Sequence, residues 1–166
     1  MNSPLKSDPY ASLRPDPPTP EEEICKCADE PPIVLQDAFS QVPLACLRCN
    51  LDVPPERIGF NEPLARGIAH WRSLHRALYV LWLDSEEYEE WASERLRDPL
   101  GRVQALGMEI VEELNAYRRA YYWWFEDNSV DDFVPPSKCP RCAGELVDRF
   151  GRSVCEACSI MVHCND

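Results

Sequence analysis

The strongest pattern along the chain is an apolar repeat, at alternating spacings of four and three residues, in the middle of the sequence. This spacing is typical of an α-helix that buries one face. A first helix is predicted to begin at Asn61, a favoured N-cap, and to end near Leu83. Its buried stripe is predicted to be Leu64, Ile68, Trp71, His75, Leu78 and Trp82.

A shorter acidic helix is predicted next, with Ser85 as its cap and its end at Arg97, ahead of a helix-breaking proline. We expect its Tyr88 and Trp91 to turn inward. Both helices belong to a predicted helical core over residues 61–127.

A third helix is predicted after Pro99, because the apolar repeat resumes and continues over 25 residues. Its stripe is Leu100, Val103, Gly107, Ile110, Leu114, Tyr117, Tyr121 and Trp124. We expect the first and third helices to form an antiparallel hairpin. Glycine costs about 1 kcal/mol of helix propensity relative to alanine, so Gly107 in the stripe predicts close approach by a large side chain such as a tryptophan.

Five consecutive aromatic residues, 121–125, end this predicted helix. At about 100° per residue they point all around a helix, so one buried stripe cannot cover them all. Tyr122 and Trp123 are therefore expected either to lie beneath a neighbouring module or to form an exposed patch that contacts a partner.

The segments on either side have a different composition. Residues 1–23 hold six prolines and few apolar residues, which predicts a disordered tail. Residues 24–58 and 135–166 combine cysteines with short apolar stretches, which favours strands and turns over helix. The expected fold class is therefore α with small β modules: a central helical hairpin plus a third helix, flanked by two zinc ribbons.

Seventeen basic residues against 29 acidic ones give a net charge of −12, which opposes binding to a phosphate backbone. No apolar run approaches the length of a membrane span, and the first ten residues lack a secretory leader. A cytoplasmic location is expected, where thiols stay reduced. Nine cysteines there indicate metal binding rather than disulfides.

The C-terminal segment holds two Cys-x-x-Cys pairs, Cys139 with Cys142 and Cys155 with Cys158, and twelve residues lie between the pairs. Each pair presents two thiolates to one tetrahedral ion, and the spacer suffices for a hairpin. Gly151 supplies the positive φ that the tight turn of that hairpin requires.

The N-terminal segment holds Cys25-Lys26-Cys27 and, after eighteen intervening residues, Cys46-Leu47-Arg48-Cys49. Asn50 is well suited to the left-handed conformation that follows the second pair. A single residue between Cys25 and Cys27 is tighter than the usual two to four. Either both bind metal in a tight turn, or one does not and another group completes the site.

The paired knuckles resemble the zinc-ribbon class, in which two such pairs at the ends of antiparallel strands hold one structural zinc. That resemblance implies two zinc ions per chain. In the class a glycine often follows the second cysteine of a knuckle, where this chain has Ala143 and Ser159. The spacing also resembles rubredoxin-like iron sites. As a whole the chain is similar to uncharacterised bacterial zinc-ribbon-containing proteins, which adds a suggestion of nucleic-acid binding.

No phosphate-binding glycine loop or catalytic triad pattern occurs in the sequence, so an enzyme is not expected. The predicted function is a protein-protein interaction adaptor with structural zinc. A nucleic-acid-binding ribbon protein is the alternative, and rubredoxin-like electron transfer is the third. A strip of basic residues that includes Arg72, Arg76, Arg118 and Arg119 could contact phosphate or an acidic protein, but a solvated helix face is the favoured interpretation.

Overall fold

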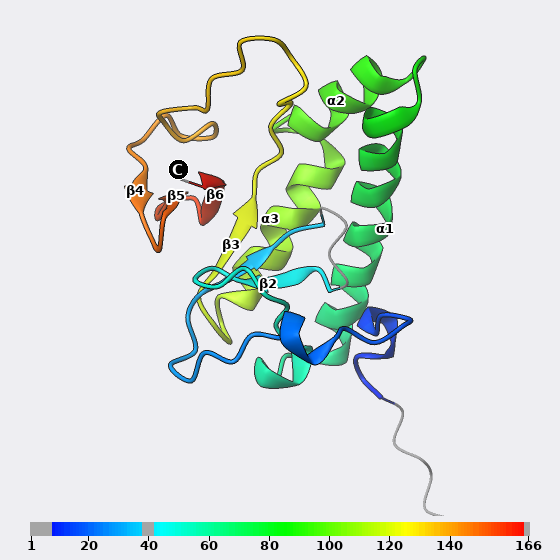
Figure 1. Ribbon diagram of the computed structural model, residues 1–166, viewed down its shortest axis with the longest axis vertical. Coiled ribbons are helices and arrows are strands. Elements are labelled where there is room, and N and C mark those ends of the chain that lie inside the picture. The colour runs from blue at the N-terminus through cyan, green and yellow to red at the C-terminus, as the bar shows by residue number, and fades with distance from the viewer. Residues whose placement is uncertain (1–7, 38–41, 165–166) are drawn as a thin grey trace, which may run out of the picture.

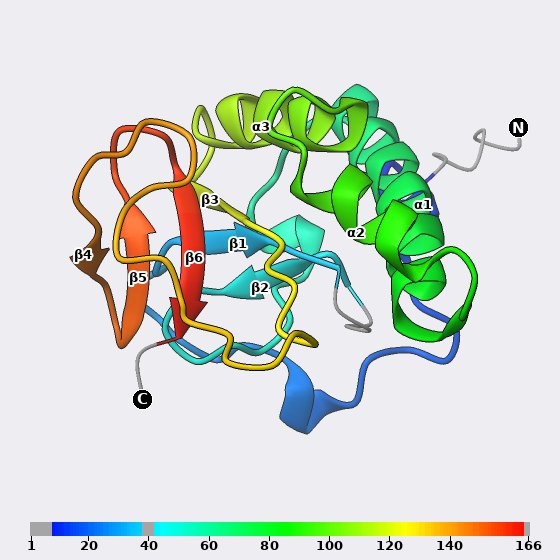
Figure 2. The ribbon, with the colours of Figure 1, turned by 90° about the horizontal axis from the view of Figure 1, so that it is seen from above.

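The computed structural model describes residues 8–37 and 42–164, which form a mixed six-stranded sheet with helices along one side (Figures 1 and 2). The strands are β1 (Ile33–Leu35), β2 (Leu44–Cys46), β3 (Ala120–Trp123), β4 (Val147–Asp148), β5 (Arg152–Cys155) and β6 (Ile160–Cys164). The α-helices are α1 (Glu62–Asp84), α2 (Glu89–Arg97) and α3 (Arg102–Leu114). Short 3-10 helices are η1 (Ala11–Leu13), η2 (Glu21–Glu23) and η3 (Pro55–Arg57).

Strand β3 joins the two cysteine-bearing modules into one sheet of order β2-β1-β3-β6-β5-β4. It pairs in parallel with β1, where Ile33 lies opposite Ala120, and in parallel with β6, where Tyr122 lies opposite Ile160. The outer pairs, β1 with β2 and β4 with β5, are antiparallel. The expectation of two separate ribbons flanking a helical core is therefore only partly met, because the modules share a sheet through β3.

The predicted continuation of the third helix through Trp124 is wrong, since α3 ends at Leu114. Asn115 closes it: its side-chain amide donates to the carbonyl of Val111 at 2.8 Å, and its side-chain oxygen accepts from the backbone N–H of Ala120 at 3.0 Å. The aromatic run then extends as a strand. Alternation sends successive side chains to opposite faces, and a sheet covered on both faces buries Tyr121 and Tyr122 together.

Helix α1 begins and ends close to the predicted positions, and α2 ends at Arg97 as predicted. The predicted cap of α2 is wrong, because Ser85 is the C-cap of α1 and α2 begins only at Glu89. The side-chain oxygen of Asn61 accepts from the backbone N–H of Leu64 at 3.0 Å, which confirms the predicted N-cap. The inward orientation predicted for Tyr88 and Trp91 is wrong, since they are 51% and 46% exposed. Ala92, Ser93 and Leu96 fill the inner face of α2 instead. No helix within the described residues has both the length and the apolar character to cross a bilayer.

Helices α1 and α3 run in opposite directions and both pack on the sheet (Figure 1). At Gly107 the ring of Tyr122 lies directly against the backbone of α3: a β-carbon there would come within 2.8 Å of the Tyr122 Cδ2 and Cζ atoms. The predicted close approach is thus made by a tyrosine of β3. Trp71 of α1 packs edge-on against the same ring, with centroids 5.9 Å apart.

Residues 8–23 differ from the predicted disordered tail, because two apolar side chains attach them to the core. Leu13 is fully buried, and the Tyr10 hydroxyl donates to the carbonyl of Phe60 at 2.7 Å. The Thr19 hydroxyl donates to the Asp52 carboxylate at 3.2 Å. Proline content alone therefore does not determine disorder here. The predicted tail's first seven residues lie outside the described part of the chain.

The sheet also has a second, smaller core away from the helices, formed by Val34, Leu47, Tyr121, Val154 and Met161. Leu47 follows β2, whereas Val154 lies in β5, near the other edge of the sheet. The Arg152 Nε atom donates to the carbonyl of Leu47 at 2.7 Å. These contacts show that the sheet curls enough to bring the residue after β2 against β5.

Gly107→Ala is expected to destabilise the protein by about 1 to 3 kcal/mol, because the added methyl group collides with Tyr122 in a packed core. Gly67→Ala is the matched control on α1, where nothing lies within 4 Å of the new β-carbon. It should instead gain about 1 kcal/mol of helix propensity. Urea unfolding of both variants measures the difference. Equal stabilisation by the two substitutions would contradict the close approach.

Candidate metal centres

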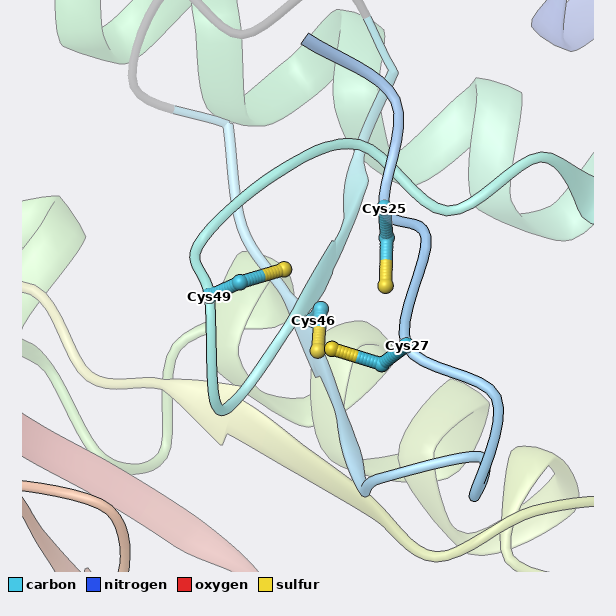
Figure 3. Close-up of side chains that lie close together, drawn as sticks. All are labelled: Cys25, Cys27, Cys46 and Cys49. Carbon is cyan, nitrogen blue, oxygen red and sulfur yellow. The ribbon is translucent and has the colours of Figure 1, made fainter. Parts of the chain in front are cut away.

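The structure brings Cys25, Cys27, Cys46 and Cys49 together, with their sulfur atoms all within 4.8 Å of one another (Figure 3). Cys46 ends β2, and the chain turns back after it: Asn50 has a φ of 60°, and its N–H donates to the Cys46 carbonyl at 2.9 Å. Cys25 is held alongside by its own N–H, which donates to the carbonyl of Asp52 at 2.8 Å. The left-handed conformation predicted for Asn50 is confirmed.

The tight Cys-x-Cys turn places both of its thiols in the cluster, so no other side chain is needed as a fourth group. Arg57 of η3 supports this turn: its guanidinium donates to the carbonyl of Cys25 and, at 2.7 Å, to that of Cys27. One cationic side chain therefore fixes the two peptide groups that carry the first pair of thiols. Sequence reasoning missed Arg57, since no spacing rule connects it to cysteines 30 residues earlier.

The C-terminal cluster contains Cys139, Cys142, Cys155 and Cys158, again with all sulfur atoms within 4.8 Å of one another. The predicted hairpin is confirmed by β4 and β5, which flank Phe150 and Gly151 in left-handed conformations with φ of 57° and 76°. The N–H of Arg149 donates to the Arg152 carbonyl at 2.8 Å, and the reciprocal bond is 3.1 Å. This two-residue turn returns the second cysteine pair to the first.

Both knuckles of this cluster form without glycine after their second cysteine. Ala143 and Ser159 adopt left-handed φ values of 56° and 54°, although this conformation costs a residue with a β-carbon roughly 1 to 2 kcal/mol. Backbone N–H groups then point at sulfur: Gly144 donates to Cys142 Sγ, and Cys158 donates to Cys155 Sγ, each at 3.4 Å. Such donors stabilise thiolates.

One thiol in each cluster is poised to ionise near neutral pH. The Gly144 N–H, followed by the neighbouring thiols, lowers the pKa of Cys142 to about 7. Burial opposes ionisation of Cys25, yet hydrogen bonds from the Cys27 N–H and nearby thiols lower its pKa to about 7. Burial raises the pKa of Cys49 to about 12. Four thiolates so close together therefore require a cation to coexist.

The donor sets fit a tetrahedral ion of the zinc type. Zinc binds thiolate sulfur at about 2.3 Å, which puts tetrahedral ligands roughly 3.8 Å apart. The Cys142 and Cys155 sulfurs are 3.7 Å apart, and every sulfur pair in either cluster lies within 4.8 Å. Four sulfur donors with tetrahedral spacing suit zinc or a rubredoxin-type iron.

Glu156 connects the C-terminal knuckle to β3. Its carboxylate accepts from Arg119 at 2.9 Å, from the Tyr121 hydroxyl at 2.8 Å and from Arg149 at 2.7 Å. The Arg119 guanidinium also donates to the Ser159 hydroxyl at 2.9 Å. The knuckle is thereby attached to the shared strand as well as to its own hairpin.

The arginine strip considered from the sequence does not form a common cationic surface. Arg72 and Arg76 both pair with the carboxylate of Asp37, whose side chain is fully buried, and Arg118 donates to the carbonyl of Pro31 at 2.8 Å. Asp37 was missed because nothing local marks it as a partner for α1. His75 is buried beside it, and burial lowers the pKa of His75 to about 4.

Comparisons of the chain with known protein families, with curated proteins and with solved structures find no match. The assignment of the two centres therefore rests on their own geometry and chemistry. Resemblance to zinc ribbons remains a likeness of the cysteine spacing and of the two knuckle-bearing modules.

Arg57→Gln is expected to weaken metal binding at the N-terminal cluster by about 10- to 100-fold, the usual effect of losing a group that orients ligands. Arg57→Lys should recover only part of this affinity, because lysine cannot hold two carbonyl groups with one planar fork. Competition with a chromophoric chelator measures the loss. Arg66→Gln is the control, since the ion pair of Arg66 within the described residues is with the exposed Glu62 on α1. Equal chelator resistance in Arg57→Gln and Arg66→Gln would contradict this role.

Proposed function

We propose that this chain is a structural-zinc protein that acts as a protein-protein interaction adaptor. The observation that carries the proposal is the pair of four-cysteine clusters, each closed by four sulfur donors. A closed site of this kind is typical of structural zinc, whereas a catalytic zinc keeps one position for water or substrate. No catalytic step is part of the proposal.

Zinc would act here by replacing a large apolar core. The strands next to the clusters are only two to five residues long, and short strands of this kind rarely hold together alone. A metal ion that binds only the folded arrangement contributes its binding energy to folding. Zinc in both clusters would thus stabilise the two ends of the sheet. A reducing compartment such as the cytoplasm would keep the eight thiols available.

Charge favours a protein partner over a nucleic acid. The net charge of −12 repels phosphate, and three arginines of the strip already pair with carboxylates: Arg72 and Arg76 with Asp37, and Arg119 with Glu156. Large apolar side chains nevertheless remain exposed, Tyr88 and Trp91 among them. Aromatic side chains at a surface are the usual anchors of protein interfaces.

Elemental analysis of the purified chain is expected to find two zinc ions per molecule. Cys142→Ser and Cys49→Ser should each leave one, because each removes a ligand from a different cluster and the clusters share no sulfur atom. The two variants are controls for one another. A coloured protein with stoichiometric iron would replace the zinc proposal by the rubredoxin-like one.

Duplex DNA and single-stranded RNA are expected to bind with dissociation constants above about 10 μM near physiological salt, since counterion release gains little for an acidic protein. Fluorescence anisotropy with labelled oligonucleotides measures this. A nuclease-treated affinity purification from the native cells should in contrast retain a stoichiometric protein. Salt-sensitive submicromolar binding to nucleic acid would favour the alternative ribbon function.

A further inference from the structure

An apolar cavity of about 350 Å³ opens at the corner between α1 and α2, lined by Leu81, Tyr88 and Trp91. Tyr88 and Trp91 are about half exposed. The inner face of α2 is already filled by Ala92, Ser93 and Leu96. Folding of this chain therefore leaves about half of each aromatic side chain uncovered, and that half is available to a ligand.

The segment that supplies Tyr88 and Trp91 to this cavity is strongly acidic, and it contacts a second acidic segment. Residues 84–98, which include α2, hold seven acidic side chains and two arginines, a net charge of −5. Residues 126–132 hold four acidic side chains and no basic one, a net charge of −4. A hydrogen bond between Ser93 of α2 and Asp127 joins the two segments. They lie at the same end of the molecule, at the top of Figure 1.

This acidic end thus carries −9 of the total −12, and its −5 segment contains Tyr88 and Trp91 of the cavity. Apolar anchors supply most of the energy of an interface, while surrounding charges select the partner and orient its approach. Arg95 already lies against the ring of Trp91, with its guanidinium carbon 5.6 Å from the ring centroid. A cationic side chain is therefore compatible with this ring surface.

We propose that the cavity formed by Leu81, Tyr88 and Trp91 docks a basic segment of a partner protein, which inserts one apolar side chain between flanking lysines or arginines. This inference deepens the proposed adaptor role and rests on it. A second copy of the chain is the less suitable occupant, because docking two such ends would bring two surfaces of charge −9 together.

The direct test uses the full-length, metal-loaded chain and a fluorescein-labelled 16-residue helical peptide composed of lysine and leucine. Two matched peptides replace all leucines by glutamine or all lysines by glutamate. The lysine-leucine peptide should bind with a dissociation constant of tens of micromolar in about 150 mM salt, and each matched peptide at least tenfold more weakly. Anisotropy titrations give all three values.

Variants of the chain then locate the binding. Trp91→Ala should weaken the lysine-leucine peptide at least tenfold, and the double variant Glu87→Gln/Glu90→Gln about threefold with a reduced salt dependence. Val147→Ala is the control, because Val147 is a similarly exposed apolar side chain on β4, in the C-terminal cysteine-bearing module. All variants should keep the melting temperature and the metal content of the unaltered chain.

The proposal is overturned if the lysine-leucine peptide does not bind, if its glutamine counterpart binds equally well, or if Trp91→Ala binds it unchanged. A concentration-dependent dimer that Trp91→Ala abolishes in analytical ultracentrifugation would assign the cavity to a second copy instead. These results are separate from those for the proposed function. Metal analysis decides the zinc sites, and a protein partner retained by Trp91→Ala would support an adaptor that uses another surface.

Discussion

The parallel pairing of β3 with both β1 and β6 is the interaction on which the rest of the structure depends. Each cysteine-bearing module contributes short strands that have little apolar surface of their own. By lying between them, β3 joins the β1–β2 pair and the strands β4 to β6 into one sheet, and α1 and α3 pack against it. Tyr122 makes this contact at its centre, because the missing side chain of Gly107 lets its ring reach the helix backbone.

Arginine side chains add polar contacts between segments of the chain that are far apart in the sequence. Arg118 reaches the carbonyl of Pro31, Arg152 reaches that of Leu47, and Arg119 binds the knuckle through Glu156. Arg118 and Arg152 donate to backbone carbonyls in the buried part of the molecule, where such groups need a partner. The long planar guanidinium suits this role because it donates in several directions at once.

The two centres and the acidic end occupy different parts of the molecule and have different chemistry. The cysteine clusters present sulfur donors beside the outer strands of the sheet, while the α1–α2 corner presents two aromatic rings on an acidic segment. In such an arrangement metal loading would set the stability of the sheet, and partner binding would fall to the helices. The connection between them runs through β3 and the packing of Tyr122 against α3.

Local rules were sufficient wherever the deciding groups lie within a few residues of one another. The sequence alone determined the N-cap at Asn61, the Phe150-Gly151 hairpin, the C-terminal set of four cysteines and the need for close packing at Gly107. For the N-terminal set it left open whether both Cys25 and Cys27 take part. Tertiary structure decided the rest. The segment 120–123 has the apolar spacing of a helix, yet it becomes a strand because β1 and β6 offer it unpaired backbone groups on both sides. Arg57 and Asp37 acquired their partners in the same way, through contacts that only folding creates, since a periodic pattern records which face is apolar but not what will lie against it.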